Sequence, residues 1–237
     1  STFKRILDAC NLRNGFNRMI KFAGFPNWAY KYTDYVGGGH RDVETEWEAA
    51  KLLTAYNAYI EGDALALSYV SNTSFYAGLL PAVRDRRYVQ NPPPTKHDLI
   101  AEGLIHPDGG VVPGNYVQIV MGDYDQASWT LYWLAGERYQ DSARGQVDCN
   151  WNLTPNSVDR VSVALDYMYR HKSERDFFIA GDCGCGYVNP TGLFGSRSPS
   201  GYPSIVPAWQ AHCRGYYRLF DYSITGWLLN GDSGTME

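Results

Sequence analysis

Long apolar runs are absent from this chain of 237 residues, and none approaches the roughly 18–20 residues that a membrane-spanning helix requires. Neither positive nor negative charge is in large excess, because the formal net charge is −4. Cysteine is scarce, and its five copies include no C-x-x-C spacing, so a disulfide scaffold is not expected, although one bridge stays open. These absences exclude a membrane span and leave no electrostatic case for nucleic acid or an anionic membrane as a partner.

The signatures of several enzyme classes are missing as well. No G-x-S-x-G elbow supports a serine nucleophile, and no phosphate-binding loop ends in Lys-Ser or Lys-Thr. Gly184 and Gly186 fail the dinucleotide-binding pattern, because Asn189 stands at the third glycine position. A metal-dependent deacetylase needs histidines beside its aspartate, and no histidine here has another four residues away. We therefore expect no cofactor.

One group of side chains could be mistaken for a zinc site, namely Cys183, Cys185, His212 and Cys213. Two adjacent ligands plus a C-x-C pair are a poor spacing for tetrahedral zinc. The pattern favours buried small side chains and a surface histidine, with no metal.

The ends of the chain carry little information. It opens at Ser1-Thr2-Phe3-Lys4, with no initiator methionine and no signal-like segment. We expect a piece of a longer precursor, so the compartment is not read from the ends. The length fits one large α/β domain over residues 1–237.

Aromatic residues, by contrast, are abundant, at 15% of the chain with 19 tyrosines and 7 tryptophans. Aromatic faces stack on the apolar faces of sugar rings, so this composition favours a carbohydrate ligand. The alternative is that these large rings fill the core.

Alternating strand and helix patterns predict a mainly parallel sheet or barrel. Helices are expected at 43–60, 126–138, 154–170 and 207–219, and strands at 64–70, 116–121, 145–150, 176–181 and 222–229. Residues 84–115 form a long proline-containing excursion, of a kind that is often functional.

Polar side chains follow three successive predicted strands: Asp123 and Asp125, then Asn150 and Asn152, then Asp182. Right-handed crossovers would bring these strand ends to one face, where catalytic groups of β/α folds collect. In an extended chain the two aspartates would point the same way, with Cα atoms about 6.5–7 Å apart. The alternative is an aspartate pair that caps the following helix.

The segment Gly184-Cys185-Gly186-Tyr187-Val188-Asn189-Pro190 resembles the signature of the GxGYxYP family of glycoside hydrolases, found largely in gut bacteria. It departs at Asn189, where the signature has tyrosine. Further segments resemble the family in the same order over roughly residues 30–225, among them Thr45-Glu46-Trp47, Gly62-Asp63-Ala64, Gly122-Asp123-Tyr124-Asp125 and Trp151-Asn152-Leu153.

The resemblance implies a two-part protein in which this chain is mostly a seven-stranded, TIM-like and possibly incomplete β/α barrel. A missing amino-terminal region would pack on the cleft, and the protein would be secreted, cell-surface or periplasmic. The family's proposed carboxylates are one Glu and an Asp-x-Asp pair, which map onto Asp123 and Asp125. Glu61 is the first choice for the Glu, and Glu46 is the second.

Paired carboxylates of this kind cleave glycosidic bonds of oligo- or polysaccharides without a metal. We expect Glu61 as the acid, Asp125 as the base or nucleophile and Asp123 as an orienting group, with inversion favoured over retention. The sugar-contacting residues are expected to be Tyr124, Asn150, Trp151, Asn152, Asp182 and Tyr187.

Two alternatives stay open. A non-catalytic carbohydrate-binding module would keep the aromatics, including Trp129, without convergent carboxylates. A glycosyltransferase would use Asp-x-Asp to hold Mn²⁺ or Mg²⁺ against a nucleotide diphosphate, but no basic cluster lies near 122–130.

Overall fold

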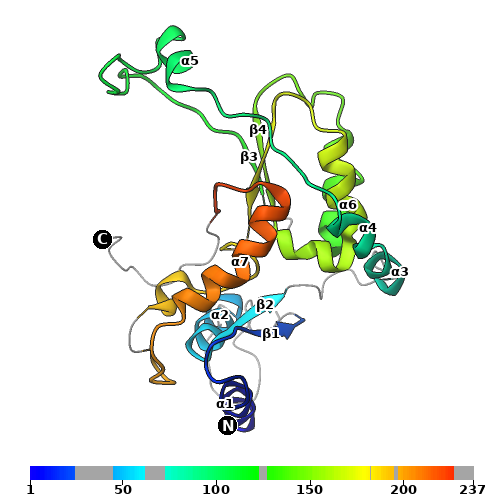
Figure 1. Ribbon diagram of the computed structural model, residues 1–237, viewed down its shortest axis with the longest axis vertical. Coiled ribbons are helices and arrows are strands. Elements are labelled where there is room, and N and C mark those ends of the chain that lie inside the picture. Colours follow the sequence, from blue (N-terminus) through cyan, green and yellow to red (C-terminus); the bar gives the residue numbers. More distant parts are fainter. Residues whose placement is uncertain (25–44, 62–72, 123–126, 182, 195–196, 227–237) are drawn as a thin grey trace, which may run out of the picture.

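The computed structural model describes residues 1–24, 45–61, 73–122, 127–181, 183–194 and 197–226 (Figure 1). The α-helices are α1 (Thr2–Asn14), α2 (Thr45–Ala55), α3 (Thr73–Gly78), α4 (Leu80–Arg84), α5 (Lys96–Ala101), α6 (Val158–Arg170) and α7 (Val206–Phe220). The strands are β1 (Ile20–Ala23), β2 (Ala58–Glu61), β3 (Val120–Met121), β4 (Cys149–Leu153) and β5 (Asp176–Ala180). A π-helix spans Trp129–Ala135, and 3₁₀ turns span Arg138–Gln140, Pro155–Ser157 and Pro190–Leu193.

The prediction of a seven-stranded barrel is wrong. Among the described residues the strands form two small parallel sheets, β1–β2 and β3–β4–β5, and neither closes on itself. The apolar run at 116–121 shows why the pattern misled: only its last two residues pair with β4. Val117, inside the run, is 87% exposed. Apolar composition there indicates strand propensity but not burial.

Several helix and strand boundaries also differ from the predicted ones. The helix expected at 43–60 ends at Ala55, because Asn57 takes a left-handed backbone (φ 59°) before β2 begins. The Trp129–Ala135 segment is a π-helix. The strand expected at 145–150 lies at Cys149–Leu153 instead, after a turn in which Gly145 has φ +85°.

Other expectations are confirmed. A 3₁₀ turn followed by α6 fills the helix predicted at 154–170, β5 matches 176–181, and α7 matches 207–219. Of the strand expected at 222–229, Thr225 makes a parallel bridge with Ala180. The strand expected at 64–70 lies outside the described residues.

Helix α7 joins two hydrophobic clusters. One surrounds β3–β4–β5 and α6, and contains Phe220 from the end of α7. The other surrounds β1–β2 and α2, and contains Trp209 and Cys213 from the first half of α7. Tyr216 and Tyr217 pack against both clusters, and α7 runs between the two sheets in Figure 1. Helix α7 therefore connects the two clusters.

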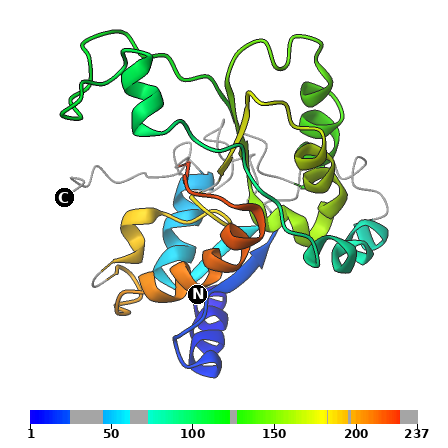
Figure 2. The same ribbon diagram turned by 45° about the horizontal axis from the view of Figure 1, so that its top comes forward.

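The proline-containing excursion projects from the rest of the molecule, with α5 at its far end (Figures 1 and 2). Thr95 caps α5 in a capping box with Asp98, so the tip is held by local bonds. Across the described ranges, no helix is both long and apolar enough to cross a membrane.

Candidate functional site

The glycine-rich loop after β5 joins the two sheets. Gly184 and Gly186 have φ +117° and +120°, a region that side chains disfavour. The loop ends in an antiparallel bridge in which Tyr187 and Ile60 exchange two backbone hydrogen bonds of 2.9 Å. The signature glycines therefore bring the chain leaving β5 against β2, one residue before Glu61.

Glu61 lies at the carboxyl end of β2 and is 4% exposed. Its Oε2 forms an ion pair with Lys21 on the neighbouring strand β1, 2.5 Å from Nζ. Its buried Oε1 accepts no hydrogen bond from the described residues. A buried carboxylate oxygen without a donor is costly, so such an atom often marks a place where a ligand donor binds.

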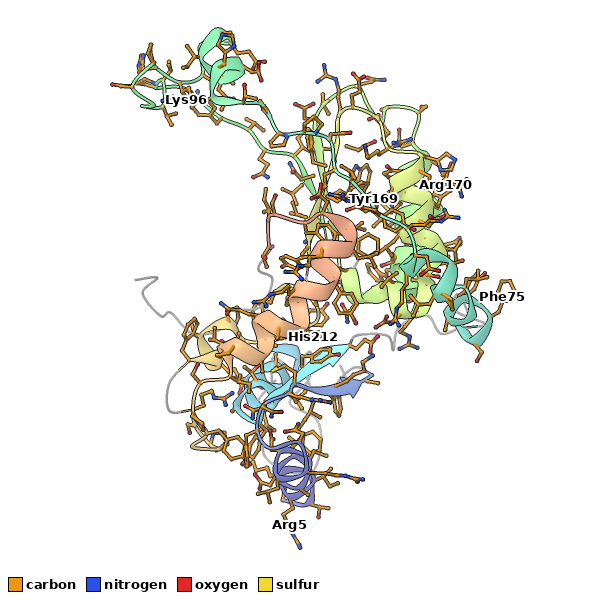
Figure 3. The ribbon with its side chains drawn as sticks, viewed as in Figure 1. Arg5, Phe75, Lys96, Tyr169, Arg170 and His212 are labelled. Carbon is orange, nitrogen blue, oxygen red and sulfur yellow. The ribbon has the colours of Figure 1, made fainter. Side chains whose placement is uncertain are left out.

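The rings of Tyr59 and His212 pack against each other near this carboxylate, with centroids 4.6 Å apart. Burial raises the pKa of Tyr59, and the charges of Glu61 and Asp159 raise this pKa further. Burial also lowers the pKa of His212, whose Nε2 lies 2.9 Å from the carbonyl oxygen of Cys185. His212 is labelled in Figure 3, on α7 where the helix passes β2.

Asp159, in the first turn of α6, is a second carboxylate whose charge raises the pKa of Tyr59. It accepts a 2.6 Å hydrogen bond from the hydroxyl of Tyr216, and burial with this bond raises the pKa of Tyr216. Sequence reasoning missed Asp159 and Lys21, and it considered His212 only as a possible zinc ligand. The available signal for Asp159, an acid in the first turn of a helix, is ordinarily explained by the helix dipole.

Asn152 occupies the carboxyl edge of the three-stranded sheet. A Cβ atom added to Gly181 would lie 2.5 Å from its Oδ1, one on Gly122 would lie 3.3 Å from its Nδ2, and one on Gly226 would lie 3.3 Å from Oδ1. Asn152 is 8% exposed, yet its Oδ1 accepts no hydrogen bond from the described residues. Three chain segments thus lie around the side-chain amide of Asn152.

The other predicted sugar-contacting residues differ in their surroundings. Trp151 is 3% exposed, packs on Tyr139 and donates a 2.7 Å hydrogen bond from Nε1 to Asp176. Tyr187 is 6% exposed in the cluster around β1–β2. Both occupy core positions, the alternative weighed for the aromatics. Asn150 is half-buried, and its Nδ2 lies 3.4 Å from the Ile119 carbonyl oxygen.

Asn156 is a buried asparagine that sequence reasoning missed. It is 1% exposed in the 3₁₀ turn after β4, and neither polar atom of its side chain has a hydrogen-bond partner in the part of the chain that the structure describes. A Thr-Pro-Asn helix start gives no sign of this burial.

Asp123, Tyr124, Asp125 and Asp182 lie outside the described residues. The backbone of Glu46 lies in α2, and its side chain is outside the description. Gly122 and Gly181, which contact Asn152, directly precede Asp123 and Asp182 in the sequence.

The cysteine and histidine side chains considered for zinc differ in burial. Cys183, Cys185 and Cys213 are buried and form no disulfide among the described residues, and His212 is half-buried rather than on the surface. No cluster of three His, Cys, Asp or Glu side chains suited to a metal ion occurs among the residues that the structure describes.

Comparisons with known proteins place the chain. No curated protein matches it. It resembles the crystal structure of "a putative hydrolase from Bacteroides thetaiotaomicron VPI-5482" with a TM-score of 0.58 and 15% identity, over 89% of this chain and 33% of that one. The chain thus spans about a third of that protein, and at this identity the likeness concerns the fold. The family profile described as "GxGYxYP putative glycoside hydrolase C-terminal domain" matches residues 114–236, just over half of the chain. The chain therefore belongs to the GxGYxYP family.

Proposed function

We propose that this protein is a glycoside hydrolase that cleaves an oligo- or polysaccharide with paired carboxylates. The observation that carries the proposal is the buried Glu61 carboxylate at the carboxyl end of β2, whose Oε1 has no donor among the described residues. The description of the family supports the reaction class, and the name of the structural neighbour supports a hydrolase. Because that neighbour is about three times as long, we propose that a further region of the protein completes the sugar-binding cleft.

Glu61 and Asn152 are connected by a short stretch of chain. Gly181 contacts Asn152, and Tyr187, six residues later, pairs with the neighbour of Glu61. Six residues span at most about 20 Å when extended. A sugar chain of a few units therefore reaches from Glu61 to the sheet edge at Gly122, the residue that precedes Asp123 in the sequence.

The ion pair with Lys21 bears on the role of Glu61. The Lys21 ammonium, 2.5 Å from Oε2, holds one carboxylate oxygen and leaves Oε1 for a donor on the substrate. We propose Glu61 and Asp125 as the two catalytic carboxylates, with Asp123 as an orienting group. The asparagine amide at the sheet edge would accept a hydrogen bond from a sugar hydroxyl.

Replacing Glu61 by glutamine, or Asp125 by asparagine, is expected to lower hydrolysis at least about 100-fold, because each removes a proton-transfer group. The measurement is release of reducing ends from a panel of neutral and acidic glycans. Glu48→Gln is the matched control, since Glu48 is exposed on α2 and its ion pair with Lys51 is long, at 3.9 Å. Full activity in Glu61→Gln, or no hydrolysis of any glycan by the wild type, would contradict the proposal.

Replacing Asn152 by alanine is expected to lower hydrolysis at least ten-fold while stability is kept. The substitution removes a buried oxygen without a donor, which costs about 1–3 kcal/mol, and this gain offsets the lost packing. Urea denaturation and the same assay check the two effects. A large loss of stability with unchanged activity would show that Asn152 serves the fold alone.

A further inference from the structure

A groove of about 670 Å³ runs along the face of α7 that is turned toward Cys183, at the start of the glycine-rich loop. Its lining includes the aromatic rings of Trp209 and Tyr217 and the basic side chains of Arg214 and Arg218. The volume falls within the roughly 300–1,000 Å³ of small-ligand sites. No role in the proposed cleavage has been assigned to any of these residues.

The two arginines are the distinctive feature of the groove. Both are exposed, and neither makes a hydrogen bond or ion pair with the described residues. They stand four positions apart on α7, so their Cβ atoms lie about 6 Å from each other on one helix face. Asp221, the acid in the lining, already accepts a 3.1 Å hydrogen bond from the backbone of Gln90. Two uncommitted guanidinium groups on a chain of net charge −4 form a local cationic site.

This groove lies near the edge that holds Asn152. Cys183 and Thr225 line it, and the backbone N–H of Cys183 donates a 3.0 Å hydrogen bond to the carbonyl oxygen of Gly226. Gly226 in turn lies against the Asn152 side chain. A ligand that contacts the sheet edge can therefore extend along α7 past Arg214 and Arg218.

We propose that the α7 groove binds the carboxylate of a uronic acid residue, so that the substrate is an acidic glycan. Guanidinium groups bind carboxylates through paired, charge-assisted hydrogen bonds. Polar Gln210, one helical turn before Arg214, and the Tyr217 ring offer contacts for the remainder of the sugar. The identification of this ligand as the substrate rests on the proposed glycoside hydrolase function, whereas binding at the groove does not.

The test is calorimetric titration of the Glu61→Gln protein, chosen to prevent cleavage, with an oligogalacturonate trimer and with a neutral hexose trimer. We expect binding of the uronate trimer alone, weakened by added salt. The double variant Arg214→Gln/Arg218→Gln on this background should bind it at least ten-fold more weakly. The matched control is Arg5→Gln/Arg13→Gln, which removes the same charge from exposed positions on α1, at the far end of the molecule in Figure 3.

Equal affinity for the two trimers, or no effect of the double arginine variant, would overturn the proposal. Inorganic sulfate that binds as tightly as the uronate trimer would overturn the assignment to a sugar. Failure of the hydrolase proposal gives a different result. If uronate binding depends on the two arginines but the wild type cleaves no glycan, the proposed binding site in the groove is supported and the proposed hydrolase activity is contradicted. Melting curves of both double variants confirm that each is folded.

Discussion

Replacing Asp176 by alanine is expected to lower the free energy of unfolding by about 3–5 kcal/mol, the usual cost of removing one partner of a buried ion pair. The Asp176 residue is 0% exposed at the start of β5. Its carboxylate is 2.5 Å from Nη1 of Arg144, and it accepts hydrogen bonds of 2.7 Å from the Trp151 indole and 2.6 Å from the Ser173 backbone. Alanine leaves the buried indole N–H without an acceptor and Arg144 without its counter-charge.

Urea denaturation measures this effect, and Asp148→Ala is the control. Asp148 also pairs with an arginine, Arg175, at 3.0 Å, but both side chains are more than half exposed. Such surface pairs contribute about 0–1 kcal/mol, so the control should change stability little. Asp176→Asn should fall between the two, because it keeps an acceptor for Trp151 but loses the charge. Equal losses in the Asp176→Ala and Asp148→Ala variants would contradict the importance of burial here.

Replacing Gly186 by alanine is expected to destabilise the fold by about 2–5 kcal/mol, from backbone strain at positive φ together with overpacking. The added Cβ would lie 2.4 Å from Cδ2 of the buried Tyr59 and 3.1 Å from the carbonyl oxygen of Ile60. The backbone oxygen cannot move without breaking the bridge between Ile60 and Tyr187. The loop would therefore separate from β2, next to Glu61.

Gly215→Ala is the matched control in the same denaturation experiment. Gly215 lies within α7 at an ordinary helical φ, and nothing stands within 4 Å of its added Cβ. Alanine there should raise stability by about 0.5–1 kcal/mol, because glycine is a poor helix former. If Gly186→Ala also left stability unchanged or raised it, the close packing of the loop against β2 would be contradicted.

Local sequence patterns were sufficient where neighbouring residues decide the structure. The apolar spacing of α6 and α7 follows the helical repeat, and β5 is a short apolar run that ends in glycine, so all three were predictable. The signature Gly-x-Gly-Tyr was recognisable without coordinates. What it does, by contrast, is tertiary: its glycines admit Tyr59 and the Cys213 thiol to within van der Waals contact of the backbone.

The sequence by itself determined the family and the strand-to-helix order after β4, because these depend on local spacing and on chain direction. Only the tertiary structure decided which polar groups are buried without donors, that Trp151 belongs to the core, and that the strands form two small sheets. Lys21 meets Glu61 across forty residues because β1 lies beside β2, and no periodicity encodes that contact. Burial and ion pairing depend on what packs against a residue from distant parts of the chain, and this information exists only in the folded molecule.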